Sequence, residues 1–237
     1  MERKRRSFPA FTSALTRTET MLVLAWLPVH LLLLPWVFAL LSERGLLSPV
    51  WSNVLFYGLG FVYMVTAAFR FLRRDFDPLC ERPFFVAGQV AYGYLGMLLF
   101  NILVGMLITD LTAAENANNA GVQALVDVSY GPMKATLVYL APLPEEMLFR
   151  AGLFGTLRRK NRLLAYAVSM LAFSLYHVWS YAAQDPSYWI YLLQYLPAGW
   201  LLARCYERTN SIWGSVFFHM LTNALAVELY RAVLQGM

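Results

Sequence analysis

The stretch Ala141-Pro-Leu-Pro-Glu-Glu-Met-Leu-Phe-Arg150 places three charged side chains inside a long apolar segment. The segment 136–157 is long enough to cross a bilayer, and its only charges are Glu145, Glu146 and Arg150. Charged groups at bilayer depth are costly, so they mark a functional site and face other protein groups. The sequence therefore predicts a polar site in the middle of a membrane-embedded helix.

Composition supports a membrane protein. The 237 residues are 59% hydrophobic and 14% charged, whereas a soluble domain carries about 25% charged residues. The net charge of +5 comes from short basic runs between apolar segments, without a basic patch interleaved with aromatic residues, so we expect the lipid bilayer and not nucleic acid as the surroundings. Cys80 and Cys205 lack any metal-binding spacing, which favours free, reduced thiols.

Seven apolar segments have about the length of a membrane span, roughly 20 residues each. They cover residues 21–41, 53–72, 84–109, 134–157, 163–183, 187–206 and 211–232. We expect an all-α, polytopic transmembrane bundle in one domain, residues 21–237, preceded by a basic cytoplasmic tail, residues 1–20. The first apolar segment lacks a small-x-small cleavage site, so it is predicted to be a retained anchor helix. The connection 110–131 has helical composition over residues 113–128, which leaves an extra helix open, but it is too polar to span and is predicted to be interfacial or partly ordered.

The distribution of Lys and Arg predicts the orientation of the chain. Basic residues concentrate in the N-terminal tail and in the second, fourth and sixth connections, at Arg73, Arg74, Arg158, Arg159 and Arg208 among others. Cytoplasmic loops of membrane proteins carry this excess. The pattern predicts a multi-pass protein of the cell membrane with a cytoplasmic N-terminus and an external C-terminus.

Helical spacing predicts different roles for the two adjacent glutamates. Glu146 and Arg150 are four residues apart and share a helix face, whereas Glu145 points about 100° away. The simplest arrangement makes Glu146 and Arg150 a structural ion pair. Glu145 is then the carboxylate available for chemistry.

Two prolines precede the glutamates, and each removes a backbone hydrogen bond. Pro142 and Pro144 are expected to free carbonyl groups near Val138 and Leu140. Freed backbone groups at membrane depth are tolerated only against protein or a water-filled cavity. A hydrated pocket at Glu145 is therefore predicted.

Three further polar side chains lie at similar predicted depth. At 1.5 Å per residue, Glu145 and His177 lie roughly 18 and 21 Å from the cytoplasmic ends of their helices, and His219 and Asn223 roughly 12 and 18 Å into the last one. These four residues are therefore expected to converge. His30, isolated between two prolines in the first segment, is predicted to be a packing residue.

Glycines in two segments predict close helix packing. They are Gly58 and Gly60 in the second segment and Gly93, Gly96 and Gly105 in the third. Small residues let helix backbones approach one another where lipid offers no hydrophobic driving force.

A family resemblance rests on three motifs in order. They are Glu145-Glu146-x-x-x-Arg150, Phe173-x-x-x-His177 and His219-x-x-x-Asn223. These motifs resemble the signatures of the CPBP family, which includes the type II CAAX prenyl endopeptidases and the Abi-type proteins. The resemblance covers residues 145–223, within a core predicted at about 134–232.

The resemblance implies an intramembrane glutamic-type endopeptidase. Glu145 and His177 would activate a water molecule that attacks a peptide carbonyl, while His219 and Asn223 would stabilise the oxyanion. Glu146, Arg150 and Phe173 would support the site, with Phe173 packing against His177. The expected substrate is a membrane-associated peptide or lipidated protein, of CAAX or leader-peptide type, and no organic cofactor is expected.

Three alternatives stay open at this point. One Glu and two His are enough ligands for an open catalytic zinc site, although no His-Glu-x-x-His helix is present. A non-catalytic membrane protein that binds peptides or confers bacteriocin self-immunity would use the same polar core. A proton-coupled transporter fits less well, since no paired repeat is visible.

Overall fold

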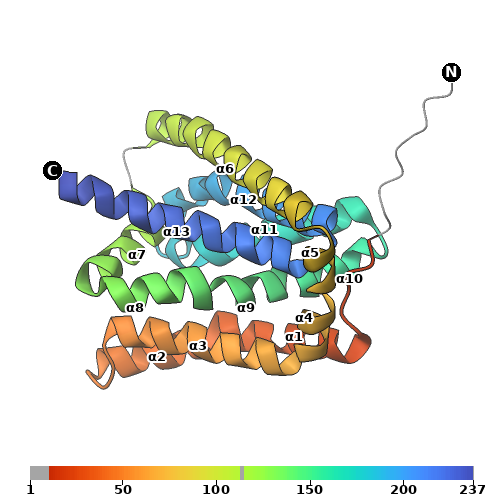
Figure 1. Cartoon of the computed structure of the whole chain (residues 1–237). Coiled ribbons are helices and arrows are strands. Elements are labelled where there is room, and N and C mark those ends of the chain that lie inside the picture. Colours follow the sequence, from red (N-terminus) through yellow and green to blue (C-terminus); the bar gives the residue numbers. More distant parts are fainter. Residues whose placement is uncertain (1–10, 113–114, 237) are drawn as a thin grey trace.

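The computed structural model describes residues 11–112 and 115–236, and every regular element in these residues is a helix (Figure 1). In chain order the elements are α1 (Arg17–Pro28), η1 (Val29–Leu33), α2 (Leu34–Glu43), α3 (Pro49–Ala67), α4 (Phe69–Arg74), α5 (Asp77–Glu81), α6 (Pro83–Leu111), α7 (Ala117–Val128), α8 (Tyr130–Ala135), η2 (Thr136–Leu140), α9 (Pro142–Glu146), η3 (Met147–Phe154), α10 (Gly155–Arg158), α11 (Arg162–Ala182), η4 (Pro186–Tyr191), α12 (Leu192–Thr209) and α13 (Ile212–Gly236). The elements η1, η2 and η3 are π-helical, and η4 is a 3-10 helix. The first ten residues of the predicted basic tail lie outside the described residues.

The all-helical bundle is confirmed. By length and composition, five helical segments of the described chain qualify as membrane spans: Arg17–Glu43, Pro49–Ala67, Pro83–Leu111, Arg162–Ala182 and Ile212–Leu234. The predicted segments 134–157 and 187–206 are also helical but did not qualify. The bundle therefore agrees with the sequence, and a total of seven spans stays a prediction.

One predicted boundary was wrong. The segment expected at 53–72 is divided between α3 and α4, because Ala68 leaves helical geometry with φ −124° and ψ 26°. Figure 1 shows α4, α5 and α10 at one end of the bundle, and α7 with the C-terminal end of α13 at the other. The Arg-rich connections thus share one end, as the alternating topology requires.

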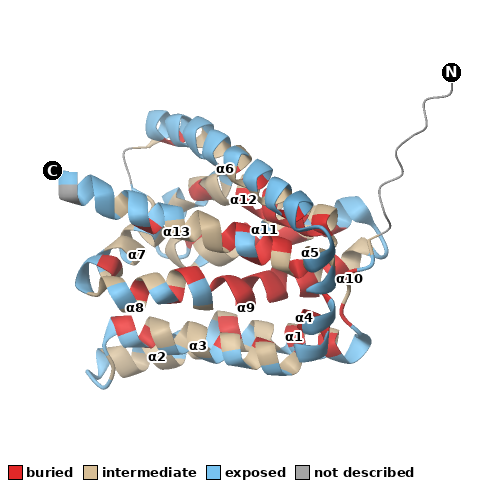
Figure 2. Ribbon diagram, in the orientation of Figure 1, coloured by how far each residue is buried: buried red, intermediate tan, exposed pale blue. Residues whose placement is uncertain are grey.

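The segment from Tyr130 to Arg158 forms a central rod that is interrupted at Ala141. The Ala141 N–H donates to the Thr136 carbonyl at 2.9 Å, five residues back, so η2 has a π-helical register just before Pro142. Residues 141–152 are all buried, and Figure 2 shows this stretch in red along α9. Helices α1, α3, α11 and α13 all contact this rod. The charged motif therefore lies at the centre of the bundle.

Glycine packing was predicted correctly at some positions and wrongly at others. A Cβ on Gly60 would lie 3.3 Å from the Pro144 side chain, and Gly93 and Gly96 also contact neighbouring side chains. Gly58 and Gly105 have no such neighbour within 4 Å. The tightest backbone approach involves Gly199 of α12, where a Cβ would lie 2.9 Å from the Met170 Cα of α11.

Two carboxylates tie the helices together at the Arg-rich end. Asp75 accepts a hydrogen bond from the Ile212 N–H, and its own carbonyl accepts one from the Ser211 hydroxyl at 2.6 Å. Burial raises the pKa of Asp75 to about 6. Glu207 accepts hydrogen bonds from the side chains of Arg162, Tyr166 and Arg158. Burial favours the neutral acid, but these bonds outweigh it and lower the pKa of Glu207 to about 2.

Candidate active site

Glu146 and Arg150 form the predicted ion pair, and both side chains are fully buried. Arg150 Nε lies 3.2 Å from Glu146 Oε2. Glu146 also accepts hydrogen bonds from two residues of α13, His219 Nδ1 at 2.9 Å and the Ser215 hydroxyl. The Arg150 guanidinium lies 4.2 Å from the centre of the Phe173 ring. Glu146 therefore connects the central rod to α13, and Arg150 connects it to α11.

Glu145 and Glu146 both face His219. Glu145 Oε2 lies 3.8 Å from His219 Nε2, on the opposite edge of the ring from Glu146. Two carboxylates and the Arg150 guanidinium leave one uncompensated negative charge in a buried cluster. Buried charges require compensation, and one added proton would neutralise this cluster.

His177 is held by its own helix and by an aromatic ring. Its Nδ1 donates to the Phe173 carbonyl at 2.9 Å, because a carbonyl oxygen only accepts. In the neutral ring, Nε2 therefore carries the lone pair. The imidazole stacks on Tyr195 at 4.5 Å and contacts the Phe173 ring at 4.5 Å, so the predicted support from Phe173 is present.

Asn223 satisfies a backbone carbonyl that the central rod leaves without a partner. Asn223 Nδ2 donates to the Leu137 carbonyl at 2.8 Å. Ala141 bonds to Thr136, and the donor one position later in the π-helical register is Pro142, which has no N–H. The sequence predicted free carbonyls near Val138 and Leu140. In the structure the π-helical register makes the Leu137 carbonyl the one that lacks a backbone donor. The second N–H of the Asn223 amide remains available to the cavity.

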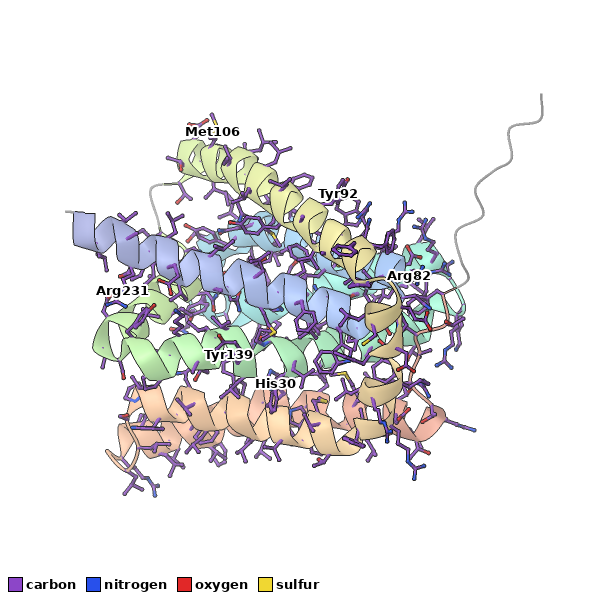
Figure 3. All side chains as sticks on the ribbon, in the orientation of Figure 1. His30, Arg82, Tyr92, Met106, Tyr139 and Arg231 are labelled. Carbon is purple, nitrogen blue, oxygen red and sulfur yellow. The ribbon has the colours of Figure 1, made fainter. Side chains whose placement is uncertain are left out.

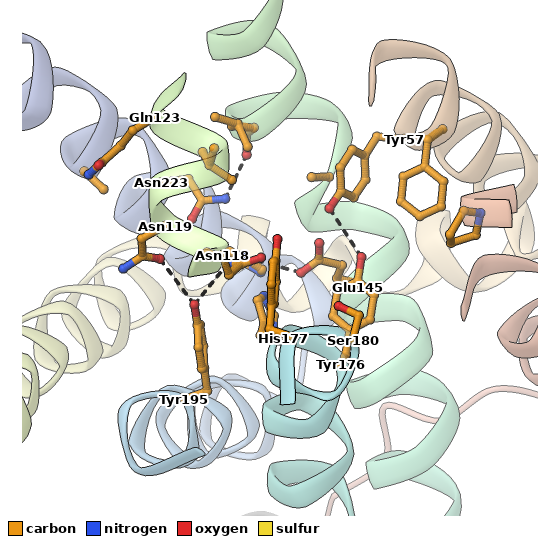
Figure 4. Close-up of a pocket in the computed structure, with 18 of the residues that line it drawn as sticks. Tyr57, Asn118, Asn119, Gln123, Glu145, Tyr176, His177, Ser180, Tyr195 and Asn223 are labelled. Carbon is orange, nitrogen blue, oxygen red and sulfur yellow. Dashed lines mark hydrogen bonds and ion pairs between the residues drawn. The ribbon is translucent and has the colours of Figure 1, made fainter. Parts of the chain in front are cut away.

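A cavity of about 440 Å³ joins these residues, and Glu145, His177, His219 and Asn223 all line it. The pocket predicted at Glu145 is therefore present. Figure 4 shows Glu145, His177 and Asn223 on elements that converge around this cavity, with Tyr57 beside Glu145. The roles of the four residues in a reaction stay predictions.

The connection between α6 and α8 forms part of the cavity, which the sequence did not predict. The segment expected to be interfacial or partly ordered contains α7, whose Asn118, Asn119 and Gln123 line the cavity. Asn118 Nδ2 donates to the Tyr195 hydroxyl at 3.0 Å, and that hydroxyl donates to Asn119 Oδ1 at 3.2 Å. Figure 4 shows Tyr195 below the two asparagines. Helix α7 is thus a wall of the site and contacts the ring that stacks on His177.

His30 also differs from the prediction, because it is more than an isolated packing residue. It lies in η1, lines the cavity and bonds through Nε2 to the Tyr176 hydroxyl at 3.1 Å. Figure 3 shows His30 where the N-terminal helices meet the central rod. No sequence spacing links His30 to the motifs. Ser215, in contrast, lies four residues before His219, so helical spacing alone indicated that it shares the same face.

The metal alternative was tested against the arrangement of side chains. Within residues 11–112 and 115–236, no group of three or more His, Cys, Asp or Glu side chains is placed to hold a metal ion. Metal dependence is therefore left to a chelator experiment.

Together, the fold and the cavity define a membrane-embedded helical protein with a buried carboxylate–imidazole site. The sequence model of the family described as "Type II CAAX prenyl endopeptidase Rce1-like" matches residues 129–225, a segment that contains all three motifs. The predicted resemblance is confirmed: residues 129–225 are similar to this family of endopeptidases.

Two curated relatives agree with this assignment. The chain is 26% identical over 143 residues to the "UPF0177 protein YxdF" of Lactococcus lactis, a match that covers 60% of this chain and 74% of the relative. It is 32% identical over 108 residues to the "Putative membrane peptidase YdiL" of Bacillus subtilis, which covers 44% of this chain and 41% of that protein. No solved structure matches the chain. The comparisons support an intramembrane protease.

Proposed function

We propose that the protein is an intramembrane endopeptidase that hydrolyses a peptide bond in a membrane-associated peptide or protein. The observation that carries this proposal is the convergence of Glu145, His177, His219 and Asn223 on one cavity, although three different helical segments supply them. Preorganised acid, base and donor groups in a water-restricted site are what hydrolysis of an amide requires.

In the proposed reaction, Glu145 and the Nε2 lone pair of His177 hold and deprotonate a water molecule. The water oxygen bonds to the carbonyl carbon of the substrate, and its proton passes to the base. The C=O electron pair moves to the oxygen, where the free N–H of Asn223 and the Nε2–H of protonated His219 stabilise the negative charge. When the oxyanion collapses, the C–N bond breaks and the leaving amine takes the proton from the base.

Glu146 and Arg150 support this proposal as structural groups. Glu146 orients His219 through Nδ1, so that Nε2 of the same ring faces Glu145. Arg150 compensates the Glu146 charge and contacts Phe173, whose backbone carbonyl orients His177. Each imidazole that is proposed to act is therefore fixed on its far side by a hydrogen bond.

The proposed substrate is a lipid-associated peptide or lipidated protein of CAAX or leader-peptide type, and the proposed location is the cell membrane with a cytoplasmic N-terminus. The family description supports the CAAX class, and the depth of the site supports an apolar or membrane-associated substrate. No organic cofactor takes part in the proposed steps.

The test compares membrane-peptide termini by mass spectrometry between cells that express the native protein and cells that express Glu145→Gln. The two proteins are matched in abundance and thermal stability, and a parallel sample receives a chelator. New termini that require Glu145 support the endopeptidase, and their loss under chelator would make the mechanism metal-assisted. Identical termini, with both proteins folded, refute catalysis and favour the peptide-binding or self-immunity alternative.

A further inference from the structure

A line of hydroxyl groups connects His30 to the proposed catalytic carboxylate. His30 Nε2 lies 3.1 Å from the Tyr176 hydroxyl, and that hydroxyl lies 3.3 Å from the Tyr57 hydroxyl. Tyr57 and Glu145 line the same cavity, so the Tyr57 hydroxyl is the group of this line that faces the carboxylate, whose Oε2 is buried without a hydrogen-bond partner among the described residues. Figure 4 shows Tyr57, Tyr176 and Glu145 next to one another on the cavity wall. The groups come from four separate elements, η1, α11, α3 and α9.

The side chain of His30 is enclosed by aromatic side chains. Its side chain is fully buried, and its ring stacks on Phe56 at 4.6 Å and on Tyr176 at 5.4 Å. Its Nδ1 is buried without a hydrogen-bond partner among the described residues. The ring lies in a π-helical turn that follows Pro28, and π-helical turns are frequent at functional sites. Burying an unpaired ring nitrogen costs free energy, and an apolar ring would fill the same space without that cost. A role beyond packing is therefore expected for His30.

The hydrogen positions along this line of hydrogen bonds can be assigned from its two end groups, His30 and Glu145. Buried N–H groups without a partner are rarer than buried acceptors without one, so the unpaired Nδ1 of His30 is the acceptor and Nε2 carries the hydrogen. Nε2–H then donates to Tyr176, Tyr176 donates to Tyr57, and Tyr57 donates to the Glu145 carboxylate. Every hydrogen is used once, and the chain ends on an ionised acceptor.

The same groups also suit a protonated Glu145. The acid hydrogen donates to Tyr57, Tyr57 donates to Tyr176, and Tyr176 donates to Nε2 of His30 in its other tautomer, at the cost of an unpaired Nδ1–H among the described residues. An imidazole at the end of the chain permits both directions, because either nitrogen can carry the hydrogen. A phenylalanine or leucine at position 30 permits neither.

We propose that His30 is a positioning residue for the reaction, and that it acts through Tyr176 and Tyr57 to orient the Glu145 carboxyl group in both of its protonation states. This inference rests on the proposed role of Glu145. His30 and Tyr57 lie outside the family match at residues 129–225, so the assignment adds residues to the site that the family comparison does not contain.

The first test is spectroscopic and needs no substrate. Infrared spectra of the protein in phospholipid nanodiscs are recorded for the native protein and for Glu145→Gln, and their difference isolates the C=O stretch of protonated Glu145. We expect this band to shift to higher wavenumber in Tyr57→Phe and in His30→Leu, because the carboxyl group loses an ordered partner. His30→Gln, which donates or accepts at the same end, restores the native position.

The matched control is Tyr63→Phe. Tyr63 lies in the same helix as Tyr57 and donates to the Leu22 carbonyl at 3.0 Å, away from the cavity. Its loss removes one tyrosine hydroxyl and one hydrogen bond without touching the proposed chain. The Glu145 band is therefore expected at its native position in this variant.

The second test is kinetic and uses an internally quenched peptide that spans a cleavage site found in the comparison of termini. Loss of a hydrogen bond to the carboxylate predicts a fall in kcat of about 10-fold for Tyr57→Phe, and loss of a bond between neutral groups predicts a fall of about fivefold for His30→Leu, with KM within about twofold of the native value in both. His30→Gln recovers most of kcat, and Tyr63→Phe retains it.

The outcomes separate this inference from the proposed function. An unshifted Glu145 band in folded Tyr57→Phe and His30→Leu overturns the positioning role, whether or not the native protein cleaves peptides. A shifted band together with an inactive native protein leaves the hydrogen-bonded chain in place and refutes the protease. Equal loss of kcat in His30→Gln and His30→Leu assigns His30 to packing and also overturns the inference.

Discussion

Replacement of Arg150 by methionine tests whether the central ion pair holds the bundle together. The guanidinium and the Glu146 carboxylate are both fully buried at 3.2 Å, so Arg150→Met leaves a carboxylate without its cation. Breaking a buried pair in this way costs about 3–5 kcal/mol. We expect the lower end, about 3 kcal/mol, because Glu146 keeps its hydrogen bonds from His219 and Ser215.

Reversible unfolding in mixed detergent micelles measures this cost for Arg150→Met, Glu146→Gln and the double variant. The double variant removes both charges, so we expect it to recover at least about 1 kcal/mol relative to the sum of the single variants. Arg162→Met is the control, since its ion pair with Glu207 has a 58% exposed arginine and is worth less than about 1 kcal/mol. A cost for Arg150→Met no larger than for Arg162→Met, or strictly additive single variants, refutes the proposed structural role of the pair.

Three further outcomes follow from the packing and the titrating groups. Gly199→Ala should destabilise the protein by about 1–3 kcal/mol in the same unfolding assay, because the added Cβ meets the α11 backbone. Gly105→Ala, where the added Cβ meets open space, should be neutral or stabilising. Equal effects of the two substitutions would contradict the close approach of α12 to α11. Asp75 has a folded-state pKa of about 6 against 3.8 for an unperturbed group, so the folded state binds the proton more tightly and this residue costs stability as pH rises from 3.8 through 6. Asp75→Asn, which keeps an acceptor for the Ile212 N–H, should therefore gain up to about 3 kcal/mol over the native protein at pH 7.5 and lose this advantage near pH 4, and a pH-independent difference would rule the shift out. The pKa of Glu207 is shifted in the opposite direction, to about 2 in the folded state against 4.5 for an unperturbed group, so its contribution to stability is complete above pH 4.5 and is lost as pH falls toward 2. Glu207→Gln should therefore cost about 1–2 kcal/mol of stability at pH 7. A cost that persists unchanged at pH 2.5 would argue against ionic stabilisation.

The sequence alone determined the class of fold and the position of the charged cluster within it. Apolar segments of spanning length require helices, because backbone groups in lipid have no other partner. The charges at Glu145, Glu146 and Arg150 stand out only because they interrupt such a segment, and helical spacing was enough to pair Glu146 with Arg150. Spacing of four residues also placed Phe173 beside its histidine, since residues on one turn contact each other in any helix.

The sequence did not determine what meets the motifs from other helices. Spacing grouped His219 with Asn223, yet the fold places His219 between the two glutamates and places Asn223 against the Leu137 carbonyl. The π-helical register around Ala141 leaves the Leu137 carbonyl for Asn223, and the packing of α13 against the rod places His219 beside the glutamates. Gly105 shows the same limit, because a small residue permits a close helix contact but the neighbouring helix must be there to make it.

The polar wall of the cavity is the clearest case of a feature that only the tertiary structure decided. His30, Tyr57 and Asn118 are ordinary residues in sequence, without a motif or a shared spacing. The bundle brings them within reach of Glu145 and His177 from segments about 30 to 150 residues distant along the chain. Local physics fixes which segments are helices and which side chains cannot face lipid, whereas the packing of helices fixes which of those side chains meet.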